Sequence, residues 1–228
     1  MSKKSFISRI TFGLFGKKTP IIGVLRLSGV IGQMGALRRG LNLSDYAEAI
    51  NKVFSIRNVK AVVLIINSPG GSPVQSELIA GRIRVLADEK NIPLIAFAED
   101  VAASGGYWLA CAADEIFALD ASIIGSIGVV SSGFGFVEMI KRLGIERRDH
   151  TVGENKSRLD PFSEELADDI DHLKSIQKDI YSGFIAMVES RRGEKLKGEK
   201  SLIFSGDFWA GSRAVSYTHL TLPTKRIV

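Results

Sequence analysis

Short apolar runs alternate along the chain with longer segments in which apolar positions recur at helical spacing. The run at residues 94–98 is typical of a central strand covered on both faces, and the runs at 21–27 and 61–66 predict a first strand and a second, buried strand. The segments with one apolar face, which are typical of helices, occupy residues 41–55, 74–90 and 163–192. This alternation predicts an α/β fold with a largely parallel sheet flanked by helices.

Weaker patterns fill the remaining length of the chain. They predict strands at 114–119, 122–130 and 146–152, and helices at 107–113 and 135–143. The predicted N-cap of the helix over 41–55 is Asn42 or Ser44. The predicted N-cap of the long helix over 163–192 is Ser163.

The N-terminal residues carry most of the excess positive charge in a chain whose net charge is +5. Basic and apolar side chains interleave in KKSFISRITFGLFGKK, so we expect residues 1–19 to form a basic amphipathic leader. Residues 1–18 could contact an anionic membrane surface or remain a disordered leader, and both alternatives stay open. No segment reaches the roughly 18 apolar residues of a membrane-spanning helix. We therefore expect a protein of the cytoplasm or of the surface of an inner membrane.

The amino-acid composition limits the classes of fold and of functional site that the chain can have. The chain has 228 residues and is 45% hydrophobic, which suits an α/β domain with an ample core. We find no nucleic-acid-binding motif and no cluster of metal-binding residues, because the three histidines are scattered. The only cysteine, Cys111, lies in an apolar run and is expected to be a buried thiol.

The segment LIAFAEDVAASGGY, residues 94–107, joins a strand to a helix through small residues. This break places Ser104 near a helix N-terminus, where unpaired backbone N–H groups can hold an oxyanion. The same position is typical of a serine that only caps the helix. Taken alone, the segment favours the capping interpretation.

A serine nucleophile also needs oxyanion donors and a base. The N–H groups of Gly105 and of Gly70 or Gly71 follow two predicted strands, so they are expected at the same carboxyl edge of the sheet. The surroundings of His150, in a charged strand, and of His172, on a helix surface, do not favour a Ser-His-Asp triad.

Lysine can replace histidine as the base when burial keeps it neutral. Lowering its pKa from about 10.4 to about 8 costs roughly 3 kcal/mol, so the fold has to hold the side chain. Lys156 is the candidate, although a solvated side chain is the ordinary expectation for one of thirty basic residues. The neighbouring acids Glu99 and Asp100 are expected to be solvated loop carboxylates rather than a catalytic acid pair.

Five segments together resemble the signal peptide peptidase A family, serine peptidases of the S49 type with a ClpP/crotonase-like fold. In family order they are INSPGG, EDVAASGGYWLA, SIIGSIGVV, GENKSRLDPF and FSGDFWAGSRA, and the resemblance covers about residues 21–214. INSPGG is shared with ClpP peptidases and is weak alone. The combination of SGGYW, GSIGV and the lysine-containing segment is specific.

The resemblance implies a Ser-Lys dyad. By this match Ser104 resembles the nucleophile and Lys156 the general base. Ser126, which its own surroundings would mark only as a turn residue, resembles the serine whose hydroxyl holds the lysine. Gly71 and Gly105 resemble the oxyanion-hole donors.

The family implies a serine endopeptidase that cleaves signal-peptide remnants or other unfolded or membrane-associated peptides. It further implies small apolar side chains before the cleaved bond, no metal or organic cofactor, and a homo-oligomer. Two alternatives stay open. A crotonase-type acyl-CoA enzyme shares the fold and the backbone oxyanion hole but needs no dyad. An inactive S49-like scaffold would have no reason to keep both the SGGY and the lysine-containing segments.

The resemblance also sets the expected domain boundaries. We expect the S49 peptidase domain to occupy residues 20–215. After FWAGSRA the family pattern continues with a segment such as ELGLVDGLG, whereas residues 216–228 read SYTHLTLPTKRIV. This segment resembles translated sequencing-adapter read-through. We therefore expect it to be a non-native tail on a domain with a truncated C-terminus.

Overall fold

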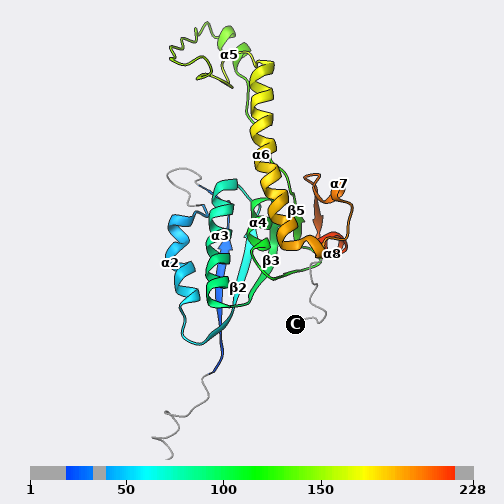
Figure 1. Ribbon diagram of the computed structural model, residues 1–228. Helices are drawn as coiled ribbons and strands as arrows, with labels where there is room; N and C mark the ends of the chain where they lie inside the picture. Colours follow the sequence, from blue (N-terminus) through cyan, green and yellow to red (C-terminus); the bar gives the residue numbers. More distant parts are fainter. Residues whose placement is uncertain (1–18, 33–39, 219–228) are drawn as a thin grey trace, which may run out of the picture.

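The computed structural model describes residues 19–32 and 40–218, and it places a six-stranded sheet behind a layer of helices (Figure 1). The strands are β1 (Ile21–Ser28), β2 (Val59–Ser68), β3 (Leu94–Ala103), β4 (Glu115–Ala118), β5 (Ile123–Gly125) and β6 (Phe208–Ala210). The helices are α2 (Leu43–Phe54), α3 (Pro73–Lys90), α4 (Gly105–Cys111), α5 (Val137–Arg142), α6 (Ala167–Arg192), the 3-10 helix η1 (Gly193–Lys195), α7 (Lys200–Ile203) and α8 (Gly211–Thr218).

The two predicted terminal segments fall largely outside the described residues. The leader predicted over 1–19 is one, since the description starts at residue 19, and the part of the tail from residue 219 onward is the other. At the predicted boundary between domain and tail, helix α8 continues through residues 216–218 without a break.

The sheet is parallel except at one edge. Its order is β1-β2-β3-β5-β6, with β4 pairing beside β5 on the same strand β3. Only β6 runs antiparallel to its neighbour, β5. This arrangement confirms the predicted α/β fold with a largely parallel sheet, and it places the ends of β2 and β3 at the same carboxyl edge.

Burial alternates along the strands, so the two faces of the sheet differ. One face carries Leu25, Leu64 and Ala96, which are buried beneath the helices. On the opposite face Val24 is 56% exposed and Phe97 is 41% exposed. The prediction that the strand over 94–98 is covered on both faces is therefore wrong for the single chain, because Phe97 is exposed. Helices pack closely on only one side.

Helices α3, α4 and α6 are tied together over the covered face. The ring of Trp108 in α4 stacks on that of Phe184 in α6, with 4.6 Å between centroids. Arg191 of α6 donates hydrogen bonds to carbonyl oxygens at the C-terminal end of α4. Asp114, just beyond α4, forms ion pairs with Arg84 of α3 at 2.8 Å and with Arg191 at 3.2 Å. These contacts fix α6 against the helix that begins next to Ser104.

Residues 130–166, which we call the arm, run along the N-terminal part of α6 and carry α5 beyond the end of that helix, away from the sheet (Figure 1). Helix α5 confirms most of the helix predicted over 135–143. The strand predicted over 146–152 is wrong, because these residues are exposed and have no strand partner. Ser163 is not the N-cap of the long helix, since α6 begins after Leu166.

None of the described helices combines the length and the apolar character that a membrane-spanning helix needs.

Candidate active site

Ser104 lies where β3 ends and α4 begins. Its backbone angles, φ 51° and ψ −122°, fall in a region that L-residues rarely adopt and that costs on the order of 1–3 kcal/mol. Ser104 occupies the N-cap position of α4, yet its side chain makes no capping hydrogen bond and is half-buried. The capping interpretation is therefore wrong. A strained serine on a strand-to-helix turn is an arrangement that presents a nucleophilic hydroxyl in α/β-hydrolases.

Ser126 lies beside Ser104 on the neighbouring strand. Ala103 and Gly125, the residues that precede the two serines, are register partners in the parallel β3–β5 pair. The N–H of Ser104 donates a 2.8 Å hydrogen bond to the carbonyl oxygen of Gly125. Ser126 also has a positive φ, 55°, and it is half-buried. The structure thus brings the two predicted serines together.

The turn at Ser126 is supported by the segment around β6. The N–H of Ser126 donates a 2.6 Å hydrogen bond to the carbonyl oxygen of Asp207. The ring of Trp209 lies so close to Gly125 that a Cβ there would come within 2.8 Å of it. We did not assign a role to either residue from the sequence. In the sequence, both residues are marked only by the FSGDFWAGSRA segment of the family resemblance. The antiparallel pairing of β6 with β5 joins residues far apart in sequence, so it leaves no local pattern.

Gly70 and Gly71 follow β2 and lie directly against the serine turn. A Cβ on Gly70 would be 2.8 Å from both the nitrogen of Gly105 and the Cβ of Ser104. Gly71 forms a bridge to Ile31, and a Cβ there would be 2.1 Å from the carbonyl oxygen of Ile31. Both glycines have positive φ angles, 103° and 144°. Only glycine fits these close approaches.

The N–H groups of Gly71 and Gly105 donate no hydrogen bond to another described residue. Gly105 is the first residue of α4, so its N–H has no intrahelical acceptor. Within the described chain, Gly71 N–H makes no backbone hydrogen bond, whereas its neighbour Ser72 donates to Ile31. Gly105 is also packed against the hydroxyl of Ser76, 2.4 Å from the position of a Cβ. Two free donors beside one hydroxyl could stabilise a tetrahedral oxyanion.

Within a single copy of the chain, Lys156 lies far from Ser104 in space. Its exposed side chain belongs to the arm, and Arg158, two residues later, forms ion pairs with Asp168 and Asp169 in the first turn of α6. Phe184, which stacks on Trp108, lies about 24 Å further along that helix at 1.5 Å per residue. The structure therefore brings Ser104, Ser126, Gly71 and Gly105 together but leaves Lys156 at the far end of α6.

Glu99, Asp100 and Cys111, which the sequence also singled out, are engaged in structural contacts or buried. Glu99 forms an ion pair with Arg26, and Asp100 accepts a 2.7 Å hydrogen bond from Asn67. Cys111 is fully buried, as predicted, and burial raises the pKa of its thiol to about 12.

A pocket of about 310 Å³ opens beside Ser126. Its lining comes from the segment after that serine, from α6 and from the turn after α7. The lining residues are Ile127, Gly128, Val129, Gln177, Lys178, Tyr181, Phe204 and Ser205. The pocket is thus positioned to receive a side chain of a molecule bound across the two serines.

Comparison with known proteins gives relatives along most of the chain. It is 52% identical over 196 residues to a Brucella melitensis protein named Na(+)/H(+) antiporter NhaA, which covers 86% of this chain and 26% of that protein. It is 30% identical over 222 residues to the chloroplastic serine protease SPPA of Arabidopsis thaliana, which covers 94% of this chain and 32% of that protein. The chain thus spans about a third or less of these relatives' length.

One solved structure shares the fold of this chain, and one family model matches its sequence. A mutant of ClpP1 from Listeria monocytogenes aligns with a TM-score of 0.55 and 14% identity, covering 90% of this chain and 92% of that one. This likeness establishes the ClpP-like fold alone. The sequence model described as Peptidase family S49 matches residues 87–219, which include the serine turn, the arm and β6. The chain belongs to peptidase family S49.

Proposed function

We propose that this chain is a serine endopeptidase domain in which Ser104 is the nucleophile. The observation that carries this proposal is the strained, half-buried Ser104, whose hydroxyl is not used as a helix cap. Glycine residues pack on both sides of it, which leaves room for a substrate backbone to approach.

In the proposed reaction, Ser104 Oγ attacks the carbonyl carbon of a peptide bond. The N–H groups of Gly71 and Gly105 hold the oxyanion that forms. The carbon–nitrogen bond then breaks, the amine leaves with the proton taken from Ser104, and water hydrolyses the resulting ester. The chain's own residues supply the nucleophile and both donors from a single edge of the sheet.

The proposed general base is Lys156 from a second copy of the chain. A single chain holds Lys156 exposed and more than 20 Å from the serine turn, as estimated from the rise of α6. A lysine acts as a base only when it is desolvated. Contact between an arm and the serine turn of another copy would provide that desolvation. The hydroxyl oxygen of Ser126, beside Ser104, would accept a hydrogen bond from the side-chain nitrogen of this Lys156.

The proposed substrates are unfolded or membrane-associated peptides, including signal-peptide remnants. A relative from Enterococcus faecium that is named putative signal peptide peptidase SppA supports this class, and the pocket beside Ser126 is proposed to receive a small apolar side chain. The substrate backbone would lie across the glycines of the serine turn.

The test is fluorophosphonate labelling together with cleavage of a panel of fluorogenic peptides and unfolded casein. We expect wild-type chain to be labelled and active. Ser104→Ala should lose both signals, while Ser131→Ala, which alters an exposed serine of the arm, should keep both. If Ser104→Ala cleaved peptides at the wild-type rate, the nucleophile would be another residue.

Two other outcomes would favour the alternatives. A wild-type chain that neither labels nor cleaves would support an inactive scaffold. Hydration of an enoyl-CoA that Ser104→Ala leaves unchanged would support a crotonase-type enzyme.

A further inference from the structure

Two buried hydroxyl groups lie against the residues that follow Ser104, and the proposed reaction uses neither of them. Among the described residues, the polar or charged side chains that are almost fully buried are Ser68, Ser76, Ser122 and Arg192. Ser76 packs against Gly105, and Ser68 packs against Gly106. A buried hydroxyl costs stability unless it is hydrogen-bonded, so its partners indicate what it holds in place.

The hydroxyl of Ser76 is used at the start of its own helix, whereas that of Ser68 binds the turn after β2. Ser76 Oγ donates to the carbonyl oxygen of Ser72 at 2.9 Å. Ser68 Oγ accepts a buried 3.2 Å hydrogen bond from Gly70 N–H. A serine hydroxyl that binds the backbone two residues further on fixes a turn. In this turn, the bond fixes the peptide that joins Pro69 to Gly70.

The next peptide along the chain, which joins Gly70 to Gly71, is held by Ile31. Ile31 N–H donates to the carbonyl oxygen of Gly70 at 2.8 Å, and Ser72 N–H donates to the carbonyl oxygen of Ile31 at 2.9 Å. In a trans peptide the C=O and N–H bonds point in opposite directions. The N–H of Gly71 therefore points away from Ile31. This N–H is one of the two donors that the proposed function assigns to the oxyanion.

Gly70 joins these two held peptides. Its φ angle is 103°, and glycine populates a wide range of backbone angles, so the residue itself does not select this value. The value is set from both sides, by the hydroxyl of Ser68 on one peptide and by Ile31 on the other. Without that hydroxyl, the buried N–H of Gly70 would lack a partner, which favours rotation of the turn and with it a new direction for Gly71 N–H.

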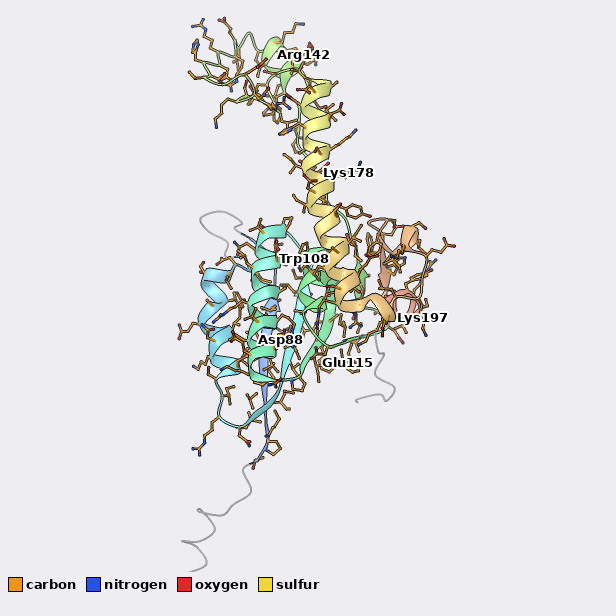
Figure 2. All side chains as sticks on the ribbon, in the orientation of Figure 1. Asp88, Trp108, Glu115, Arg142, Lys178 and Lys197 are labelled. Atoms are coloured by element: carbon orange, nitrogen blue, oxygen red, sulfur yellow. The ribbon has the colours of Figure 1, made fainter. Side chains whose placement is uncertain are left out.

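The helix that carries the second donor, α4, is packed against the same serine. A Cβ on Gly106 would clash with the carbonyl oxygen of Ser68 and would lie 3.2 Å from its Cβ. Trp108, whose N–H donates to the carbonyl oxygen of Ser104, marks this helix between α3 and α6 in Figure 2. The same view shows Arg142 of the arm far from it. The two donors are therefore positioned inside one copy of the chain, by residues of the sheet domain.

We propose that Ser68 is a positioning residue for peptide cleavage. Its hydroxyl holds the peptide before Gly70 and thereby fixes the direction in which Gly71 N–H meets the oxyanion. Ser68 is fully buried, so it acts through Gly70 and does not touch the substrate. This role rests on the proposed function, in which Gly71 is an oxyanion donor. In the sequence, Ser68 is marked only as part of INSPGG.

The first test compares peptide cleavage by the wild-type chain and by Ser68→Ala. We expect kcat to fall by about 10- to 100-fold, less than the roughly 10²- to 10³-fold loss on deleting an oxyanion donor outright. KM should change by less than about twofold, because the substrate makes the same contacts before the oxyanion forms. A peptide aldehyde adds to Ser104 Oγ as a hemiacetal, with the serine proton passing to the aldehyde oxygen. Its Ki should rise by about the same factor as kcat falls.

Two further variants separate the effect of the hydroxyl from effects of volume and of stability. Ser68→Cys fills nearly the same space, but sulfur accepts hydrogen bonds weakly, so this variant should lose kcat as Ser68→Ala does. Ser122→Ala is the matched control, because it removes a buried hydroxyl that binds the carbonyl oxygens of Ala98 and Glu99. It should lower the melting temperature while kcat and the aldehyde Ki stay within about twofold of wild type.

The second test measures amide hydrogen exchange by NMR and does not depend on catalysis. Ser104→Ala is compared with the double variant that also carries Ser68→Ala. The exchange rate of Gly70 N–H should rise at least about tenfold, because its hydrogen-bond acceptor is gone. Val62 N–H, which donates to the carbonyl oxygen of Pro93 from the same strand, should keep its rate and so shows that the sheet stays folded.

Four results would overturn the positioning role. Three are unchanged kcat and Ki in Ser68→Ala, an equal loss of kcat in Ser122→Ala, and an unchanged exchange rate of Gly70 N–H. The fourth is a rise in KM at unchanged kcat, because Ser68 would then support substrate binding alone. A wild type that does not cleave peptides would overturn the proposed function, and the exchange rate alone would then decide whether Ser68 holds the turn.

Discussion

At the scale of single residues, the conformation of Ser104 makes a prediction about stability. Ser104→Gly and Ser104→Ala both remove the hydroxyl, but only glycine adopts φ 51° and ψ −122° without strain. The glycine variant should therefore be more stable than the alanine variant by about 1 kcal/mol, even though glycine usually destabilises. Urea unfolding of the two inactive variants measures this difference. Equal stability would mean that the native backbone at this position is not strained.

The close packing of Gly70 makes a second prediction. Gly70→Ala adds a methyl group 2.8 Å from the nitrogen of Gly105, at a backbone position that already disfavours alanine. We expect loss of fluorophosphonate labelling and a destabilisation of more than about 2 kcal/mol. Gly144→Ala is the matched control, because Gly144 also has a positive φ, 66°, but open space around it. It should cost about 1 kcal/mol and keep labelling.

The residues of the serine turn differ in how far the sequence could predict them. The apolar pattern predicted that Ser104 and Gly105 lie at a strand-to-helix turn, but that segment alone favoured a capping serine, and the family resemblance was needed to assign the nucleophile. Ser126 was found only through family resemblance, since its position depends on strand pairing between β3 and β5. Asp207 and Trp209 were not assigned a role, because their contacts with the turn come from the distant edge of the sheet.

At the scale of elements, apolar periodicity located most strands and helices of the sheet domain, because burial on one face imposes it. The pattern failed in the arm. Residues 146–152 were predicted as a strand, yet no sheet lies beside them and their side chains are exposed. The start of α6 was placed too early at Ser163, because the first turn depends on Arg158 binding Asp168 and Asp169 across the arm. Contacts of this kind leave no local signature.

The ion pairs that join α3, α4 and α6 predict how stability responds to acid. Partial burial alone would raise the pKa of Asp114, but the hydrogen bond from Leu94 N–H and the guanidinium groups of Arg84 and Arg191 lower it below its usual 3.8. The carboxylate therefore stabilises the fold above that pH, and the contribution is lost as the pH falls through the lowered pKa.

The measurement is the unfolding free energy of wild type and Asp114→Asn from about pH 7 to about pH 2. Asp114→Asn should be less stable at neutral pH and should lose less stability below about pH 4. Parallel curves for the two proteins would contradict a role for this carboxylate in acid unfolding. Asp88→Asn, at the exposed partner of Arg84, is the control for removing one surface charge.

At the scale of the whole molecule, the separation between arm and serine turn predicts complementation between copies. Ser104→Ala and Lys156→Ala should each be inactive in peptide cleavage. Mixing them under conditions that allow exchange should restore up to about a quarter of wild-type activity, because random pairing gives that share of intact sites. The control mixes Ser104→Ala with a chain that carries both substitutions, and it should stay inactive. No recovery after proven exchange would contradict a base supplied by a second copy.

The position of Lys156 in space is the part that the sequence could least predict. Its spacing from Ser104 fits the family, and spacing along the chain carries no information about whether two side chains meet within one copy or between two. Within a single chain, the 26-residue helix α6 keeps Lys156 apart from Ser104, because it carries the arm away from the sheet.

The hydrogen bond from Ser126 N–H to Asp207 has a consequence for biosynthesis. A ribosome makes Ser104 and the arm long before it makes Asp207 and β6, so the emerging chain contains the hydroxyl without the strand that holds its neighbour in place. We expect nascent chains stalled before residue 207 to resist fluorophosphonate labelling, and chains released after residue 218 to accept it. Labelling of the shorter chains would show that β6 is dispensable. If only the longer chains are labelled, the order of translation itself keeps Ser104 silent until β6 has been made.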